Sequence, residues 1–416
     1  MRIKEHVVAI SRRQLLTAAA GSTALTAGFS FPAPAQGSSI KLGSILDNSG
    51  LLDIYGKPMV MATAMAVEEI NGAGGLLGRK VELKQYDSQS DIALYTKYAQ
   101  QLVRDDKVDV VHAGITSASR EAIRQTFRRA NTLYFYNVLY EGGVCDRNCV
   151  ITGTTPAQAV EPIIDYAMKK WGNKIYTIAA DYNYGQITAK WVAHYAEERK
   201  GTVVKTDFFP LDVADFGSTI AKIQDAAPNF VVSALVGGSH MAFYRQWAAS
   251  GMNKRIPLTS TTFGVGNEHL ALSAAEGDGI LIAGNYSQEI PDAANKEFLA
   301  RWQKKFGDTK IVHEIAVSQY HGIKLWAECV KQAGSIEREA ILKVIESGAA
   351  KVDGPAGLVV IEPKTHHASL DIRLMVVRDQ KLSIIETAKQ RPPSDTAQYC
   401  DLLKNPNENK QFEVKI

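Results

Sequence analysis

The chain has 416 residues, 45% of them hydrophobic and 22% charged, which is the composition of an ordinary globular protein long enough for two domains. Its formal net charge is +3, and residues 1–35 carry this excess, because Arg2, Lys4, Arg12 and Arg13 are opposed there only by Glu5. The rest of the chain is therefore close to neutral, which removes the main electrostatic support for a nucleic-acid partner.

Residues 1–35 have the pattern of an export signal. After the basic start come the arginine pair Arg12-Arg13, an apolar stretch rich in alanine, and Ala33-Pro34-Ala35, a small-x-small cleavage site. The arginine pair favours the twin-arginine route. A membrane-spanning helix is the alternative, but the stretch is short and rich in Ala, Gly, Ser and Thr. We predict a periplasmic protein that is not inserted in the membrane after signal cleavage.

From residue 39 onward, short apolar runs alternate with amphipathic helical patterns. The first series of predicted strands is SIKLGSILD, VELKQYD, VDVVHAGIT and TLYFYNVLY. After TGTTPAQAV the alternation restarts with KIYTIAADYN and continues to IPLTSTTFG. This order predicts an α/β fold with two Rossmann-like lobes, each built on a parallel sheet.

The two lobes are predicted to exchange segments. We assign residues 39–155 to lobe 1 and 156–286 to lobe 2. We expect 287–358 to return to lobe 1 and 359–390 to lobe 2, because helical patterns after residue 290 are followed by the β-rich stretch GLVVIEPKTHHASLDIRLMVV. Residues 391–416 form a C-terminal tail. Three crossings between the lobes would act as a hinge.

The cysteines belong to an oxidising compartment, where pairing is favoured. Cys145 and Cys149 are near neighbours in GGVCDRNCV, and we predict a disulfide between them, with Cys400 as a competing partner for either. Cys329 lies in a helical pattern and is interpreted as a buried thiol. No metal is predicted, because two thiols without two further nearby ligands do not complete a tetrahedral zinc site.

Candidate ligand contacts are sought at the ends of the predicted strands. In open parallel sheets ligands bind beyond the carboxyl ends of the strands, and two facing sheets enclose a cleft. Ser117 follows such a strand and opens a helix, so its hydroxyl and the free N–H groups of the first turn can hold a carbonyl oxygen or a carboxylate. A residue that only caps the helix is the alternative.

Tyrosines mark the strand ends in AADYNYGQ and LYEGG. Tyr182 and Tyr184, with Tyr140, offer flat walls with a phenol group, which suits a small planar amide that needs both stacking area and a hydrogen bond. If the backbone stays extended, Tyr182 and Tyr184 point the same way. Tyrosines that pack the hinge between the lobes are the alternative.

Several segments give the chain a resemblance to a known family: VEEINGAGGLLGRKVEL, TSASR at 116–120, YNVLYEGG, ADYNYG, and the block from DFGSTIAKIQ to VSALVGG. Over residues 39–390 the chain resembles the type I periplasmic solute-binding proteins of ABC transporters, of the branched-chain amino acid class, and most of all the urea and short-chain amide binders. The resemblance implies a Venus-flytrap fold, a membrane permease as partner, and capture of a small polar organic nitrogen compound between the lobes. A branched-chain or other neutral amino acid is the alternative ligand.

The predicted ligand contacts are Ser49, Tyr55, Thr116, Ser117, Tyr140, Tyr182, Tyr184, Gly237 and Thr262. Two positions depart from the urea and amide pattern, because Ile115 stands where those relatives often have an aromatic residue and Val138 replaces a small polar one. The pocket is therefore expected to be less polar. An amino acid would also require a partner for its ammonium group, and Asp47, Glu141 and Asp181 are the acids placed to serve.

Enzymatic motifs are missing from the sequence. GGLLGRK lacks the GxGxxG spacing, and no GxxxxGK[ST], HExxH or GxSxG occurs. Cys149 or Ser117 could act as a nucleophile only with a distant histidine, and the histidines are scattered. We expect a binding protein with no cofactor, and not an enzyme.

Overall fold

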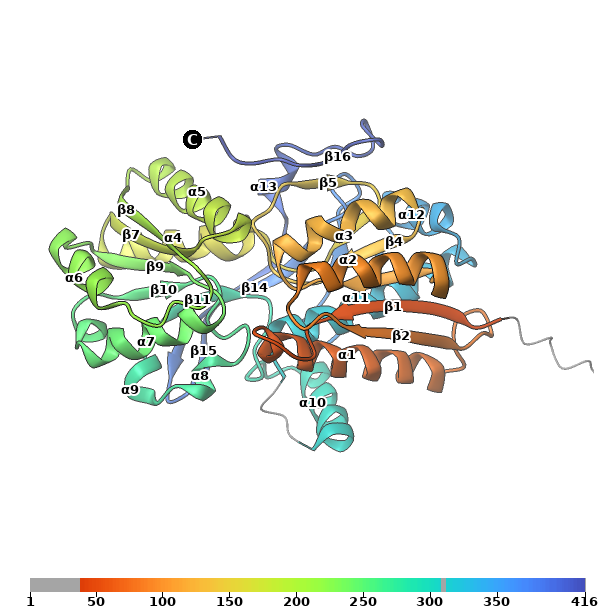
Figure 1. Ribbon diagram of the computed structural model, residues 1–416, viewed down its shortest axis with the longest axis horizontal. Coiled ribbons are helices and arrows are strands. Elements are labelled where there is room, and N and C mark those ends of the chain that lie inside the picture. The colour runs from red at the N-terminus through yellow and green to blue at the C-terminus, as the bar shows by residue number, and fades with distance from the viewer. Residues whose placement is uncertain (1–37, 308–311, 416) are drawn as a thin grey trace, which may run out of the picture. The chain divides into compact units, whose positions relative to one another are not determined.

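The computed structural model describes residues 38–307 and 312–415, which belong to one compact unit (Figure 1). The predicted signal peptide, with Arg12 and Arg13, lies outside the described residues. Strands and helices alternate along most of the chain. The predicted α/β class with parallel-sheet lobes is confirmed.

The first sheet consists of parallel strands in the order β2-β1-β3-β4-β6. Its strands are β1 (Ile40–Leu46), β2 (Val81–Asp87), β3 (Val110–Ala113), β4 (Leu133–Tyr136) and β6 (Cys149–Ile151). The helices connecting them are α1 (Asp53–Gly72), α2 (Ile92–Gln101), which continues into a π-type turn at Leu102–Asp106, and α3 (Ser117–Arg129). Most central strand residues are buried, as expected for a parallel sheet covered by helices on both faces.

The second sheet begins with the parallel order β8-β7-β9-β10-β11 and continues through antiparallel strands. Its strands are β7 (Lys174–Ala180), β8 (Thr202–Phe209), β9 (Phe230–Ala234), β10 (Leu258–Ser260), β11 (Leu281–Gly284), β12 (Lys351–Val352), β13 (Val359–Ile361), β14 (Ala368–Arg378) and β15 (Lys381–Arg391). The helices of this part are α4 (Pro156–Trp171), α5 (Asn183–Glu198), α6 (Gly217–Ala226), α7 (Gly238–Ala249), α8 (Glu268–Ala271) and α9 (Ala274–Gly277), with a 3-10 turn at Met252–Lys254. In both sheets the second strand along the chain lies at the edge, the first lies beside it, and the third and fourth follow in order.

Local signals explain where the main helices begin. Thr116 caps α3 by accepting the N–H of Ser119, whose side chain in turn accepts the N–H of Thr116. The start of α4 combines a capping box between Thr155 and Gln158 with Pro156 at the first helical position.

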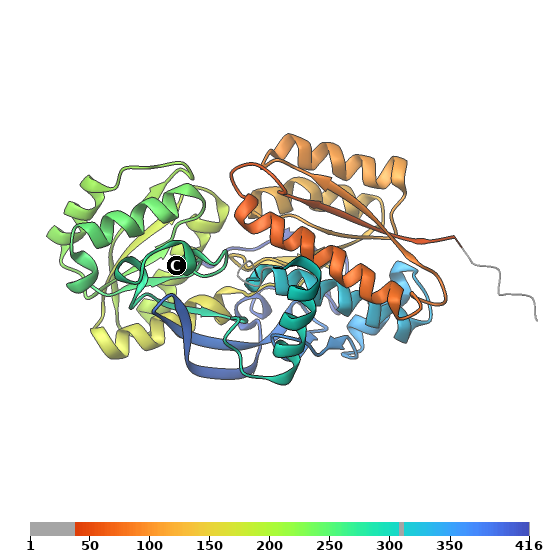
Figure 2. The same ribbon diagram turned by 90° about the horizontal axis from the view of Figure 1, so that it is seen from below.

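After β11 the chain leaves the second sheet. The next helices are α10 (Ala293–Phe306), α11 (Glu314–Ala333) and α12 (Arg338–Glu346). Figure 2 shows α10 beside α1, where Arg301 donates to Glu69 at 2.9 Å. Gln319 of α11 donates to Thr63 of α1 at 2.9 Å. The chain then returns to the second sheet, where β14 pairs with β11. On this basis we propose the division predicted above: lobe 1 as 39–155 with 287–358, and lobe 2 as 156–286 with 359–390. Within 287–358, β12 is the exception, because it pairs with β13 of the second sheet.

The predicted disulfide is wrong. The structure joins Cys145 to Cys400, with their Cα atoms 5.4 Å apart, while Cys149 is a free, buried cysteine. Cys145 lies in β5 (Val144–Asp146), which pairs with β16 (Asn409–Gln411) in a separate two-stranded sheet. Cys149 belongs instead to β6 in the first sheet, where it pairs with Tyr134 of β4. Closeness in sequence therefore did not bring the two thiols together, because their strands join different sheets. Cys329 is free and buried, as interpreted.

Candidate ligand-binding site

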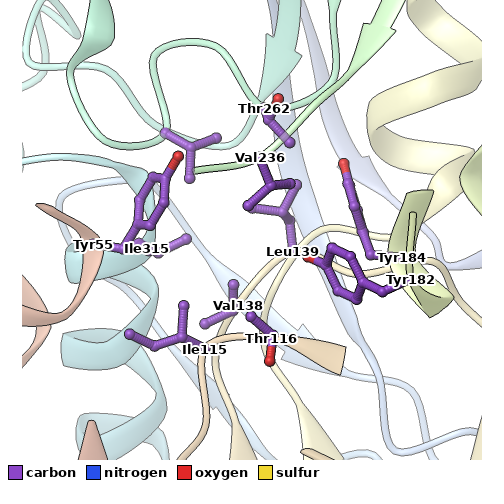
Figure 3. Close-up of a pocket in the computed structure, with 11 residues that line it drawn as sticks. Tyr55, Ile115, Thr116, Val138, Leu139, Tyr182, Tyr184, Val236, Thr262 and Ile315 are labelled. Atoms are coloured by element: carbon purple, nitrogen blue, oxygen red, sulfur yellow. The ribbon is translucent and has the colours of Figure 1, made fainter. Parts of the chain in front are cut away.

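A small pocket lies where the ends of strands from both lobes meet (Figure 3). Its volume is about 40 Å³, more than a single water molecule requires. The lining consists of three tyrosines, two threonines and six aliphatic residues, none of them charged: Tyr55, Ile115, Thr116, Val138, Leu139, Tyr182, Tyr184, Val236, Thr262, Val265 and Ile315. It is thus an apolar and aromatic pocket with a few hydroxyl groups.

Strand ends supply most of this lining. Ile115 and Thr116 follow β3, Val138 and Leu139 follow β4, and Tyr182 follows β7. Val236 follows β9, and Thr262 follows β10. The pocket therefore lies where open parallel sheets are expected to bind ligands, beyond the carboxyl ends of the strands.

The segment ADYNYG forms a tight turn from strand to helix. β7 ends at Ala180, and Tyr182 is the N-cap of α5, so Tyr184 lies in the first helical turn. The backbone is therefore not extended from Tyr182 to Tyr184, which was the condition for the two side chains to point the same way as in a strand. The two rings nevertheless lie together, with centroids 6.2 Å apart. A side chain on Gly185 would place its Cβ 2.0 Å from the carbonyl oxygen of Ala180, so the turn requires glycine there.

The two tyrosines differ in their polar contacts. Tyr184 is 5% exposed, and its hydroxyl forms a hydrogen bond of 2.8 Å with that of Thr261. The hydroxyl of Tyr182 makes no hydrogen bond to any residue that the structure describes. Figure 3 shows both rings on one side of the pocket and Tyr55 on the opposite side. Tyr182 is consequently the better placed of the two to offer a phenol to a ligand.

Tyr55 connects the two lobes beside the pocket. Its hydroxyl donates to the carboxyl group of Glu268 at 3.2 Å, and this group also accepts the backbone N–H of Gly264 at 2.7 Å and that of Gly266. Burial raises the pKa of Glu268 to about 7. Burial, and then the neighbouring Glu268, also raise the pKa of Tyr55. A carboxyl group that titrates near neutrality therefore lies at the contact between the lobes.

A buried ionic network lies behind the first turn of α3. Ser117 donates its hydroxyl to Glu141, and Arg120 donates to the same carboxylate at 2.8 Å. Both members of this ion pair have fully buried side chains. The Arg120 guanidinium also lies over the ring of Tyr140, 4.8 Å from its centroid. Glu141 is thus engaged by protein groups.

The structure brings five of the nine predicted contacts to the pocket: Tyr55, Thr116, Tyr182, Tyr184 and Thr262. The other four lie outside its lining. Ser117 donates to Glu141, and Tyr140 hydrogen-bonds His367. Ser49 donates to Asp87 at 2.7 Å, and Gly237 is the N-cap of α7 with a φ of 74°.

Six lining residues were not among the predicted contacts, although Ile115 and Val138 had been noted as departures from the urea and amide pattern: Ile115, Val138, Leu139, Val236, Val265 and Ile315. Leu139 lies within the predicted strand TLYFYNVLY, and Val236 directly precedes the predicted contact Gly237, so both are next to predicted contacts in the sequence. Ile315 comes from α11, far along the chain, and no local pattern marks it.

No cluster of three or more His, Cys, Asp or Glu side chains in residues 38–307 and 312–415 is arranged to hold a metal ion. None of the helices in the same ranges combines the length and hydropathy needed to cross a membrane.

Solved structures share this fold. A solute-binding protein of an ABC transporter from R. palustris, in complex with 4-hydroxybenzoate, has a TM-score of 0.78 at 24% identity, covering 86% of this chain and 100% of the other. The branched-chain amino acid transporter substrate-binding protein of Streptococcus pneumoniae, in complex with isoleucine, has a TM-score of 0.70 at 21% identity, covering 83% and 99%. At these identities the likeness establishes the fold.

Family membership is established by sequence. Residues 40–401 match the family described as periplasmic binding protein domain. A Leu/Ile/Val-binding protein homolog from Brucella melitensis is 23% identical over 367 residues, which is 83% of this chain and 86% of the relative. The names of this relative and of the two solved structures are those of binding proteins. The chain belongs to the periplasmic binding protein family.

Proposed function

We propose that this protein works in the periplasm and captures a small, planar, largely apolar molecule, such as an aromatic acid, for delivery to a membrane permease of an ABC importer. The observation that supports this most is the lining of the pocket, where Tyr55 faces Tyr182 and Tyr184 across a mainly aliphatic interior (Figure 3). Flat apolar walls with a few hydroxyl groups suit an aromatic ring with polar substituents.

A carboxylate on such a ligand has a natural partner at the start of α3. The N–H of Ser119 is bound by Thr116, and that of Arg120 by the carbonyl of Thr116. The N–H groups of Ser117 and Ala118 bind no acceptor in the residues described. The positive end of a helix with free N–H groups stabilises an anion. Related folds in complex with 4-hydroxybenzoate and with benzoate are consistent with this ligand class.

Two other ligand classes compete with this proposal. Urea or a short-chain amide, expected from the sequence, is supported by the free hydroxyl of Tyr182 and by Thr116 and Thr262 in the lining. The six aliphatic residues offer such a ligand no hydrogen bonds. A neutral amino acid, as in the isoleucine complex, would need an ammonium partner, and the pocket lining contains no carboxylate.

A thermal-shift panel separates these classes. The probes are 4-hydroxybenzoate, benzoate, acetamide, urea and isoleucine. A ligand present at 100 times its dissociation constant adds about 2.7 kcal/mol to the free energy of unfolding, so a true ligand raises the melting temperature clearly. We expect the aromatic acids to give the largest shift. A shift with acetamide, urea or isoleucine and none with the aromatic acids would overturn the proposed ligand class.

Replacing Tyr182 by alanine tests the pocket itself. The change removes stacking area and a free hydroxyl from the pocket wall, so affinity should fall by about 2 kcal/mol, roughly thirtyfold. Calorimetric titration with the best probe measures this. The matched control is Tyr98→Ala, which removes a ring stacked on Tyr86 at 4.7 Å, away from the pocket lining. If Tyr182 only packs the hinge, the melting temperature of the free protein will fall while the affinity stays within about twofold of the parent.

Changing both Arg12 and Arg13 to lysine tests the export route. If transport depends on the arginine pair, the precursor will accumulate in the cytoplasm. Fractionation followed by immunoblotting distinguishes the precursor from the processed protein. Normal processing of the double-lysine form would show that export does not use the twin-arginine route.

A further inference from the structure

The C-terminal segment after β15 crosses part of the protein as a strap, defined here as residues 394–415. The strap starts with α13 (Ser394–Ala397), is joined to β5 by the Cys145–Cys400 disulfide, and contributes β16 to the two-stranded sheet with β5. Figure 1 shows it running past β5 toward α5. The match to the family ends at residue 401, so β16 lies beyond it.

One face of α3 binds the strap. The contacting side chains come from positions 120, 124, 125 and 128, and residues three to four positions apart lie on the same side of a helix. Arg120 donates to the side chain of Gln411 at 3.0 Å, Arg124 and Gln125 donate to the carbonyl of Asn409 at 2.9 and 3.3 Å, and Arg128 donates to the carbonyl of Asn407 at 2.9 Å. This is the helix whose N-cap, Thr116, lines the pocket.

Gln411 also completes the buried network behind that helix start. Its side-chain amide donates to Glu141 at 2.5 Å and to the carbonyl of Gly142 at 3.1 Å. The same carboxylate accepts from Ser117 and Arg120. A single residue of the strap therefore contacts both charged groups that hold the first turn of α3.

The strap reaches α5 as well. Glu413 forms an ion pair with Lys190 at 2.5 Å, and the indole N–H of Trp191 donates to the carbonyl of Glu141 at 3.0 Å. The ion pair is exposed to solvent and contributes little energy. The hydrogen bond of Trp191 is the stronger link, because this side chain is only 1% exposed. The first turn of α5 carries Tyr184, and its N-cap is Tyr182. The strap and the Glu141 segment thus connect the two helices whose beginnings both contribute to the pocket lining.

We propose that the strap positions the ligand-binding ends of α3 and α5 relative to each other, with Gln411 as its main positioning residue and the Cys145–Cys400 disulfide as its anchor. Loss of Gln411 leaves the Glu141–Arg120 pair without its amide partner and loosens the first turn of α3. The role of the strap in ligand capture rests on the function proposed above. Its role in holding the two helices is independent of that function.

Hydrogen exchange of the ligand-free, full-length protein, followed by mass spectrometry, tests the positioning. The variants are Gln411→Ala, the double change Cys145→Ser with Cys400→Ser, and the control Lys410→Ala. Lys410 lies in the same strand with an exposed side chain. We expect peptides covering residues 117–124 and 183–191 to exchange about tenfold faster in Gln411→Ala and in the double serine variant, and at the parent rate in Lys410→Ala.

Two outcomes would overturn the proposal: faster exchange confined to residues 398–415, or equal acceleration in Lys410→Ala. Gln411→Ala decides the question alone if the double serine variant does not fold. Calorimetric titration with 4-hydroxybenzoate adds the link to binding, where we expect Gln411→Ala to bind at least about fivefold more weakly than the parent. Should the parent not bind this probe, the ligand class fails while the exchange result still decides the role of the strap.

Discussion

Replacing Glu141 by alanine will lower the free energy of unfolding by about 3–5 kcal/mol. The reason is the Arg120 guanidinium, which is fully buried and forms a 2.8 Å ion pair with Glu141. Without the carboxylate, a buried positive charge remains uncompensated, and Ser117 loses the acceptor of its hydroxyl. Denaturant unfolding followed by circular dichroism measures the change.

The control for this substitution is Glu339→Ala. Glu339 pairs with Arg147 at 3.0 Å, but its side chain is 58% exposed, so the expected loss is at most about 1 kcal/mol. A Glu141 variant that unfolds within about 1 kcal/mol of the parent would show that the buried pair contributes no more than a surface one.

The contribution of Glu268 to the stability of the protein will fall as the pH rises through neutrality. Burial raises the pKa of Glu268 from 4.5 to about 7 in the folded protein. Because folding favours the protonated form, the stabilisation is complete below about pH 4.5 and is lost as the pH rises through about 7. A shift of this size corresponds to roughly 3 kcal/mol. Burial also raises the pKa of Glu314 to about 7, so this residue adds to the same trend.

Glu268→Gln isolates the first of these groups. The amide does not ionise, so the stability of the variant should rise relative to that of the parent between about pH 5 and 8. Glu297→Gln, at an exposed helix position, is the control for the substitution itself. Unfolding free energies measured at several pH values decide the matter. A Glu268→Gln profile that follows the parent at every pH would place the ionisation of Glu268 outside this range.

The fold was largely predictable because its signals are local. Apolar runs such as KIYTIAA and the helical patterns between them recur in βα order, and the structure has β7 at Lys174–Ala180. Strand ends then identified Thr116, Tyr182 and Thr262 as neighbours of the pocket, because the carboxyl ends of parallel strands meet at one edge of a sheet.

Long-range contacts escaped the sequence analysis. Cys145 pairs with Cys400, 255 positions away, and no spacing rule distinguishes this partner from Cys149. Ser117 was expected to face the ligand, but its hydroxyl is taken by Glu141, and only the tertiary structure shows that acceptor. The strap is of the same kind, since Gln411 lies in a polar tail whose contacts with α3 depend on the folded chain.

The most direct measurement of the central claim is a crystal structure of the protein grown with 4-hydroxybenzoate. We expect density for the ring between Tyr55 and the Tyr182–Tyr184 pair, with the carboxylate directed at the free N–H groups that begin α3. A ring bound outside this pocket, or an empty pocket at a ligand concentration far above that used in the thermal-shift panel, would contradict it.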